Sequence, residues 1–236
     1  MFKKSAAFYD EVFISKGKDY YGEIVKLNQF IQNYAKGSAK TLLEIACGTG
    51  AHTIYLYPKY DITGLDLDPG LLDTARDRFP SLNFYEGSMI DFDLGQEFDL
   101  ITCLASAIGY VCTVEKLNQT IQTLARHLRP GGMMLIEPWL TPEQYIPGKV
   151  FSFQVDKPDL KVTRMNVNVL RDKISVLEFH YLIGTADGIE HSIELHELGL
   201  FTLEEYQAAF DAAGLITTFD PKGLVGRGLY IAHRPE

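Results

Sequence analysis

Hydrophobic positions follow two alternating patterns along the chain up to about residue 137. Stretches with apolar residues three or four apart predict helices, and short apolar runs predict buried strands. The helical stretches are residues 20–36, 69–79 and 114–128, and the strand-like runs are 41–46, 61–66, 82–86, 98–103 and 133–137. Strands that alternate with helices indicate a parallel sheet covered on both faces.

The pattern changes between about residues 149 and 197. This segment contains period-two stretches such as LKVTRMNVNV and ISVLEFHYLIG, with breaks at 171–173 and 186–188. Alternation with such breaks predicts antiparallel hairpins. A helical pattern at 203–215 and apolar runs near 215–220 and 228–233 then resume the first pattern. We therefore predict a single α/β domain, residues 1–236, with an antiparallel β layer inserted at about 149–197.

Composition narrows the possible partners and the compartment. The net charge is −9, without a cluster of basic residues, and phosphate backbones demand a basic face, so we expect no nucleic-acid partner. No apolar run approaches the ~20 residues that cross a bilayer, and the first residues lack the apolar segment of a signal peptide. Three cysteines without metal-like spacing fit free thiols. A cytoplasmic protein without membrane association is expected.

The stretch LEIACGTG, residues 43–50, is the most informative motif. A strand runs into a glycine turn, and Gly48 and Gly50 allow the backbone to approach a ligand closely. Asp66 ends the next strand, where a carboxylate can accept hydrogen bonds from both hydroxyls of a ribose. The pair predicts a nucleoside-containing ligand.

Other interpretations of this motif remain open. A nicotinamide-dependent oxidoreductase would carry a third glycine, whereas this chain has His52 and Thr53 near that position. A glycine turn without any ligand is also possible, and Asp66 by itself could cap the helix that begins at Pro69.

The AxGxG arrangement resembles the class I S-adenosylmethionine-dependent methyltransferases. Across nearly the whole chain, ordered segments look like the sugar N,N-dimethyltransferases of desosamine and mycaminose biosynthesis, which act on thymidine-diphosphate (dTDP) 3-amino sugars. The resemblance implies a Rossmann-like sheet, S-adenosylmethionine as methyl donor, S-adenosylhomocysteine as product, and a homodimer. The segments that carry it are GKDY (17–20), LLEIACGTGAH (42–52), GSMIDFDLG (87–95), SAIGY (106–110), HLRPGG (127–132), EPW (137–139), LGLFTLEEYQAAFDAAGL (198–215) and GRGLY (226–230).

The resemblance also implies a set of cofactor-binding residues. Tyr9 and Tyr20 would lie near the methionine end, where an aromatic face attracts a sulfonium. Ser88 and Met89 would flank the adenine, with Ser88 where the family usually carries Asp, so its hydrogen bond would lack charge assistance. The full set is Tyr9, Tyr20, Ala46, Gly48, Gly50, Asp66, Leu67, Ser88, Met89 and Leu104.

On the acceptor side, the resemblance places Tyr110 beside the acceptor nitrogen. Glu137 and Trp139 would contact the substrate, and Arg164 and Arg227 would face its diphosphate, because a guanidinium can bind phosphate oxygens bidentately. An unperturbed tyrosine titrates near pH ~10, so we expect Tyr110 to orient the amine and to relay its proton rather than to act as an indispensable base.

The sequence leaves open the roles of several histidines and the identity of the methyl acceptor. His127 is expected to bond carbonyls at a helix end, and His180, His191 and His196 are expected to be structural or substrate-lining, since their spacing does not indicate a metal site and methyl transfer requires no metal. Val176 stands where a basic residue is expected. The acceptor could therefore be another small amine, an amino acid, a peptide N-terminus or a hydroxyl, and a non-catalytic binding module is a further alternative.

Overall fold

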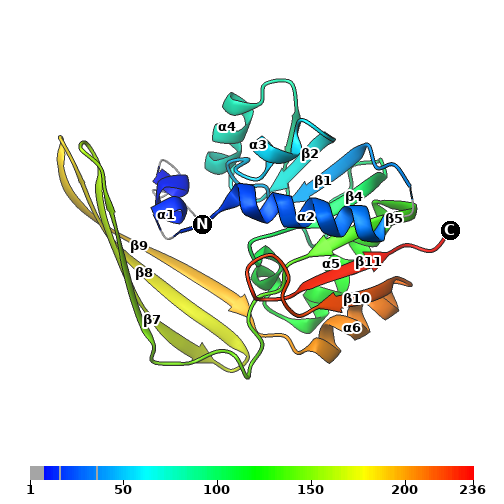
Figure 1. Cartoon of the computed structure of the whole chain (residues 1–236). Helices are drawn as coiled ribbons and strands as arrows, with labels where there is room; N and C mark the ends of the chain where they lie inside the picture. Colours follow the sequence, from blue (N-terminus) through cyan, green and yellow to red (C-terminus); the bar gives the residue numbers. More distant parts are fainter. Residues whose placement is uncertain (1–7, 16, 36) are drawn as a thin grey trace.

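The computed structural model describes residues 8–15, 17–35 and 37–236. Its centre is a seven-stranded sheet in the order β10-β11-β5-β4-β1-β2-β3 (Figure 1). The strands β1 to β5 pair in parallel, and β11 is antiparallel to both β5 and β10. Their bounds are β1 (Thr41–Ile45), β2 (Asp61–Asp66), β3 (Asn83–Glu86), β4 (Phe98–Cys103), β5 (Leu128–Ile136), β10 (Ile216–Asp220) and β11 (Leu229–His233). The predicted parallel α/β sheet is confirmed.

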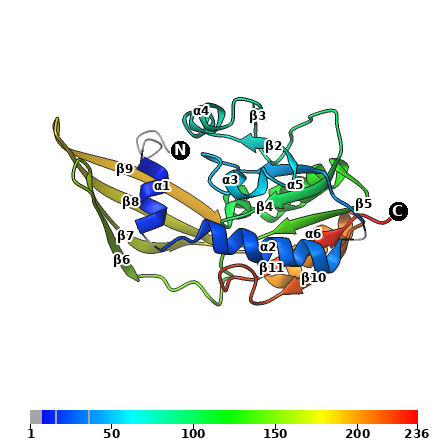
Figure 2. The same ribbon diagram turned by 45° about the horizontal axis from the view of Figure 1, so that its top comes forward.

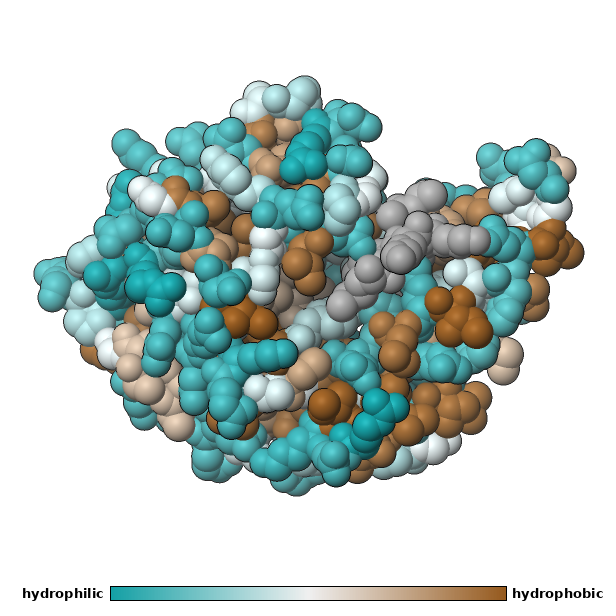
Figure 3. Space-filling view, turned by 180° about the vertical axis from the view of Figure 1, so that it is seen from behind, coloured by the Kyte–Doolittle hydropathy of each residue, from teal (hydrophilic) through white to brown (hydrophobic). Residues whose placement is uncertain are grey.

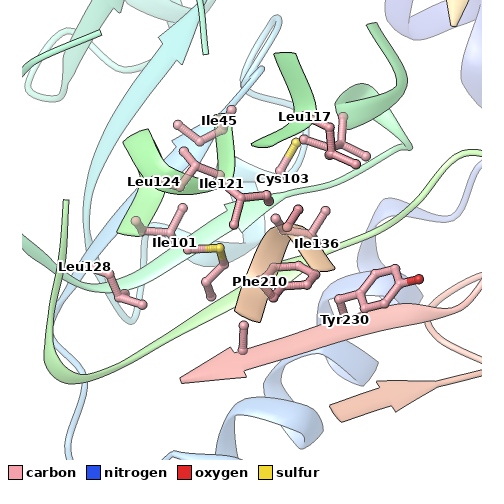
Figure 4. Close-up of a cluster of buried hydrophobic side chains, with 14 of the residues drawn as sticks. Ile45, Ile101, Cys103, Leu117, Ile121, Leu124, Leu128, Ile136, Phe210 and Tyr230 are labelled. Atoms are coloured by element: carbon pink, nitrogen blue, oxygen red, sulfur yellow. The ribbon is translucent and has the colours of Figure 1, made fainter. Parts of the chain in front are cut away.

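Helices cover both faces of this sheet. On one face, Ile121 and Phe210 pack among Ile101, Ile136 and Tyr230 (Figure 4). The opposite face is covered by α2, whose apolar side forms a second core cluster with β1, β4, β5 and β11. No helix within the described ranges is long and apolar enough to span a bilayer. The helices are α1 (Tyr9–Ser15), α2 (Tyr20–Tyr34), α3 (Thr53–Leu56), α4 (Pro69–Arg78), α5 (Val114–Arg126) and α6 (Leu203–Ala212), with a 3-10 helix η2 (Ala107–Val111).

The strand β5 begins five residues before the predicted start. Its Pro-Gly-Gly segment suggests a turn, but the backbone of Gly131 and Gly132 exchanges hydrogen bonds with the backbone of Arg234. Leu128 pairs with Phe98, and pairing with β4 then resumes only between Met133 and Leu100, so the intervening residues bulge from the ladder. Hydrogen bonds from the C-terminal segment therefore hold this Pro-Gly-Gly sequence, which is typical of a turn, within the strand β5.

The inserted layer forms a separate four-stranded antiparallel sheet, β6 (Val150–Asp156), β7 (Lys161–Arg171), β8 (Ile174–Thr185) and β9 (Gly188–Gly199) (Figure 2). The predicted hairpin breaks are confirmed, and the layer ends two residues later than expected. The helix α1 packs on its inner face, where Phe8 and Val12 join Val155, Val162 and Tyr181 in a small core cluster. The inner face of the small sheet therefore points toward the α/β body (Figures 1 and 2).

Candidate active site

A cavity of about 590 Å³ lies between the carboxyl ends of the parallel strands and the inner face of the small sheet. Such sheet edges form the ligand crevices of open α/β folds, and ligand pockets generally measure about 300–1,000 Å³. Its walls come from α1, the loops after β1, β2 and β3, the segment between β4 and α5, the small sheet and the loop before β11. A smaller cavity of about 40 Å³ adjoins it and shares Tyr9, Ala46, Gly48 and Leu104 with it.

The glycine loop and the Asp66 carboxylate form one hydrogen-bonded unit. Gly48 has φ +56° and donates its N–H to Asp66 Oδ2 at 2.8 Å, while Asp68 donates its N–H to Oδ1 at 2.9 Å. Burial raises the pKa of Asp66, and these two backbone hydrogen bonds oppose the rise. A Cβ added to Gly48 would meet only a Leu71 methyl at 3.9 Å, so this face of the loop is open to the cavity. The turn is shaped to admit a ligand against its backbone.

A group of buried polar side chains, which we call the polar layer, packs next to the glycine loop. Thr53 donates its hydroxyl to Glu44 at 2.6 Å, and His52 Nε2 lies 2.9 Å from Glu23. Both carboxylates are buried. Tyr20 packs edge-on against the His52 ring with 4.9 Å between centroids. This layer forms part of the wall of the smaller cavity.

The segment after β4 has an unusual backbone. Ala105 and Ser106 both have positive φ, at 53° and 61°, which is uncommon outside glycine and costs conformational energy. Glu137 compensates by accepting the Ala105 N–H at 2.9 Å, and Ser106 donates its hydroxyl to the Pro138 carbonyl at 2.7 Å. This turn leads directly into η2, which presents Tyr110 to the cavity.

The Tyr110 hydroxyl is hydrogen-bonded to Nδ1 of His196 on β9, at 2.8 Å. The other ring nitrogen of His196 lies 3.7 Å from the Glu194 carboxylate. Burial is the main cause that raises the pKa of Tyr110 well above its usual range, and nearby Tyr181 and Glu194 add to the rise. Tyr110 is therefore held as a neutral phenol in the cavity wall.

Two arginines face the cavity from different elements. Arg164 on β7 is 5% exposed, and its guanidinium lies between the rings of Phe153 and Phe179, 4.3 Å and 3.9 Å from their centroids. Its Nε has no hydrogen-bond partner among the described residues. Arg227 is more exposed; it donates a hydrogen bond to Ser106 Oγ at 3.0 Å and lies 5.3 Å from the ring centroid of Trp139. Both guanidinium groups can receive an anionic ligand.

Comparison with known proteins agrees with this architecture. The family described as "Methyltransferase domain" matches residues 42–132. The dTDP-3-amino-3,6-dideoxy-alpha-D-glucopyranose N,N-dimethyltransferase of Streptomyces fradiae is 38% identical, over 95% of this chain and 89% of its own length. The dTDP-3-amino-3,4,6-trideoxy-alpha-D-glucopyranose N,N-dimethyltransferase of Streptomyces venezuelae is 34% identical over 96% of each chain.

The chain belongs to the dTDP-amino-sugar N,N-dimethyltransferase family. Solved structures agree: DesVI of Streptomyces venezuelae superposes with a TM-score of 0.92 at 33% identity, covering 99% of both chains. CalS10, an amino pentose methyltransferase from Micromonospora echinaspora with bound S-adenosylmethionine, superposes with a TM-score of 0.87 at 35% identity, covering 96% of both chains. The expected class I methyltransferase fold is thereby confirmed.

Most residues predicted from the sequence meet at the large cavity of this methyltransferase. Tyr20 lines the smaller cavity, and Gly50 and Glu137 line neither of the two. The residues in the large cavity wall are Tyr9, Ala46, Gly48, Asp66, Leu67, Ser88, Met89, Leu104, Tyr110, Trp139, Arg164 and Arg227.

Two predicted positions have a structural explanation that differs from ligand contact. Gly50 has φ +75°, and a Cβ there would lie 3.0 Å from the Phe79 ring, so backbone conformation and packing both favour the glycine. Glu137 is fully buried beneath the wall, where it holds the Ala105 N–H and lies 3.7 Å from Arg227. Only its Oε2 accepts that N–H, and Oε1 has no hydrogen-bond partner among the described residues, so substrate contact through Glu137 stays a prediction.

Sequence reasoning missed part of the acceptor side. Tyr181, Asn166 and Asn168 line the cavity, and the role of His196 as the partner of Tyr110 was not predicted. Period-two alternation places the even-numbered residues of β7 on one face of the small sheet. Which residue of the next strand lies opposite each of them depends on the register between the strands, which the alternation does not specify. Val176 is buried and lies outside the cavity wall.

His127 lies as expected at a helix end, whereas His180 and His191 do not line the cavity. His127 caps α5, with Nδ1 2.8 Å from the Thr123 carbonyl, while Nε2 accepts the Leu94 N–H. His180 and His191 stack on each other on the exposed face of the small sheet.

Proposed function

We propose that this methyltransferase transfers methyl groups from S-adenosylmethionine to the amino group of a dTDP-linked amino sugar and releases S-adenosylhomocysteine. The observation that carries the proposal is one continuous cavity, with the Gly48–Asp66 crevice at one wall and Tyr110, Arg164 and Arg227 at others. The names of relatives similar over nearly the whole chain, and S-adenosylmethionine bound to CalS10, support the same chemistry.

The donor side fits S-adenosylmethionine. Asp66 uses one lone pair on each oxygen for backbone N–H groups, and a carboxylate has about four acceptor positions, so capacity remains for the ribose hydroxyls. Gly48 and Ala46 would let the ligand lie against the loop. Ser88, which lies on the cavity wall and accepts the Ile90 N–H, would approach the adenine beside Met89.

Apolar and aromatic residues would complete the donor side. Leu67 and Leu104 would contact the adenosyl group, and Tyr9 and Tyr20 would lie near the methionine end. Gly50 would contribute through the shape of the loop. When bound, the cofactor supplies an electrophilic methyl group and a sulfur leaving group.

The acceptor side supplies orientation. Arg164 and Arg227 would bind the diphosphate, Trp139 would pack against the nucleotide sugar, and Tyr110 would accept a hydrogen bond from the amine. Because burial raises the pKa of Tyr110, the phenol stays protonated and is a poor base, so we expect the amine to bind in its neutral form. Correct alignment of two reactants can contribute ~7–11 kcal/mol, so positioning alone provides a large acceleration.

The test is methylation of dTDP-3-amino-3,6-dideoxy-α-D-glucopyranose, followed by mass spectrometry, with a dTDP-4-amino sugar as comparison because one relative is named for a 4-amino substrate. We expect one and then two methyl groups on the 3-amino sugar. Tyr110→Phe should reduce turnover moderately, with Tyr57→Phe, an exposed tyrosine, as its control. Complete loss of turnover in folded Tyr110→Phe would refute its role as an orienting group, and methylation of neither sugar would refute the proposed acceptor.

We further propose that the enzyme is a cytoplasmic homodimer that acts on a small molecule and binds neither nucleic acid nor membranes. The outer face of the small sheet exposes about half of each of four apolar side chains, and Figure 3 shows hydrophobic residues gathered over this part of the molecule. These side chains are Met165, Leu182, Ile193 and Leu195. Ile193→Asp should yield monomers in light scattering; an unchanged dimer would exclude this face.

A further inference from the structure

The pairing of Tyr110 with His196 joins the two sheets across the cavity. Tyr110 comes from η2 after the main sheet, and His196 from β9 of the small sheet. The side chain of His196 is 1% exposed, and its ring also packs against Phe179 with 4.7 Å between centroids. Such burial fixes the ring and therefore fixes which direction its Nδ1 faces.

The surroundings of His196 select one proton arrangement. Glu194 lies 3.7 Å from Nε2, beyond hydrogen-bond distance but near enough for the charge of an ionised carboxylate to favour a proton on that nitrogen. The proton of a neutral imidazole therefore belongs on Nε2, which leaves Nδ1 as an acceptor. Tyr110 must then be the donor in the 2.8 Å hydrogen bond.

This direction matters for an amine nucleophile. A tyrosine hydroxyl with a free proton would donate it to the nitrogen lone pair, which is the pair that must attack the methyl carbon. When the proton is committed to His196, the hydroxyl offers the amine only acceptor lone pairs. The amine then donates an N–H to Tyr110 and keeps its own lone pair available. A monomethylated amine still has one N–H, so the same arrangement serves a second methylation.

We propose that His196 is a positioning residue that holds Tyr110 as a hydrogen-bond acceptor for the substrate amine. This inference rests on the proposed amino-sugar N-methylation. It assigns to a residue of the inserted sheet the control of lone-pair direction at the reacting nitrogen, with the nearby Glu194 carboxylate favouring the tautomer that carries its proton on Nε2.

Two substitutions separate this role from simple packing. In His196→Asn the amide reaches about the position of Nδ1, and in His196→Gln it reaches about the position of Nε2. With dTDP-3-amino-3,6-dideoxy-α-D-glucopyranose as acceptor, we expect kcat to fall about tenfold in His196→Gln, as for loss of one hydrogen bond made in the transition state. His196→Asn should recover a substantial part of that loss. KM and the affinity for S-adenosylhomocysteine should stay near wild type in both.

The control is His191→Gln, on the same strand but on its exposed outer face, which should leave kcat unchanged. In a Tyr110→Phe background, His196→Gln should cause no further loss of kcat. A wild-type kcat in His196→Gln, a change confined to KM, or additive losses in the double variant would each overturn the inference.

Nitrogen NMR of His196 in the wild-type protein provides a readout that does not depend on turnover. We expect the neutral tautomer with its proton on Nε2; a proton on Nδ1 would overturn the inference even if methylation proceeds. If the wild type shows the expected tautomer but methylates neither sugar, the proposed acceptor is wrong. The proposed role of His196 toward the substrate amine would then be wrong as well.

Discussion

Glu44→Gln should stabilise the protein at alkaline pH and have a much smaller effect at acidic pH. Glu44 lies in β1 directly beneath the glycine loop and is 2% exposed. Burial raises its pKa from 4.5 to about 7, with a smaller upward contribution from Asp66, although the hydrogen bond from Thr53 opposes the rise. The folded protein therefore favours the neutral acid, which a glutamine amide resembles in shape and in its ability to accept from Thr53.

The sign follows from proton uptake on folding. Between pH 4.5 and about 7, folded Glu44 binds a proton that the unfolded chain has released, so stability falls as pH rises through this window. Each pH unit between the two pKa values corresponds to about 1.4 kcal/mol. From about pH 5 to about pH 8, the free energy of unfolding of Glu44→Gln relative to wild type should therefore rise by about 2.5 kcal/mol.

Equilibrium unfolding in urea at a series of pH values measures this difference, and Glu23→Gln is the matched control. Glu23 is also buried and contacts the same His52, yet its hydrogen bonds from His52 and Lys18 outweigh burial and lower its pKa. Its ionised form contributes stability that is lost as pH falls through the lowered pKa, so Glu23→Gln should be most destabilising near neutral pH. A stability difference for Glu44→Gln that does not vary with pH would refute the reasoning.

Two further predictions concern the donor side. Asp66→Asn should weaken S-adenosylhomocysteine binding about 10- to 100-fold in calorimetry, because an amide loses charge and can accept only one of the two backbone N–H bonds; Asp61→Asn, exposed at the other end of β2, should bind normally. Gly64→Ala should lower the free energy of unfolding by about 1–3 kcal/mol, because its Cβ would overlap the Phe84 ring. Gly37→Ala should leave the free energy of unfolding unchanged, because the space around Gly37 is open. Equal stability of the two variants would contradict the packing argument.

The main sheet could be predicted because its signals are local. The run from Thr41 to Ile45 and the run from Asp61 to Asp66 are short, apolar and bounded by turn residues, and both strands have the predicted positions. The start of β5 could not be predicted, since Gly131 and Gly132 join the strand through hydrogen bonds with Arg234, about a hundred residues further along the chain. The packing of α1 likewise depends on contacts with the small sheet.

In the active site, too, the part marked by local sequence signals could be predicted and the part that depends on distant contacts could not. Its donor side depends on backbone geometry that glycine and an acidic residue mark in the sequence, and Gly48 and Asp66 do lie in direct hydrogen-bond contact. The acceptor side depends on strand register: Arg164 faces Tyr181, and Glu194 faces Phe179, only because β7, β8 and β9 pair in one particular alignment. A shift of one residue would turn each of these side chains to the outer face.

This dependence on register explains why the inserted sheet can alter acceptor choice without disturbing donor binding. The hydrogen bond between Tyr110 and His196 is a contact between the two sheets that faces the cavity, and its direction determines whether the hydroxyl presents a proton or a lone pair there. A change in register at β9 would remove His196 from this position and leave Asp66 and the glycine loop intact. Such a protein would still bind the methyl donor but would lose control of the amine, so donor affinity and turnover should respond independently to changes in the two sheets.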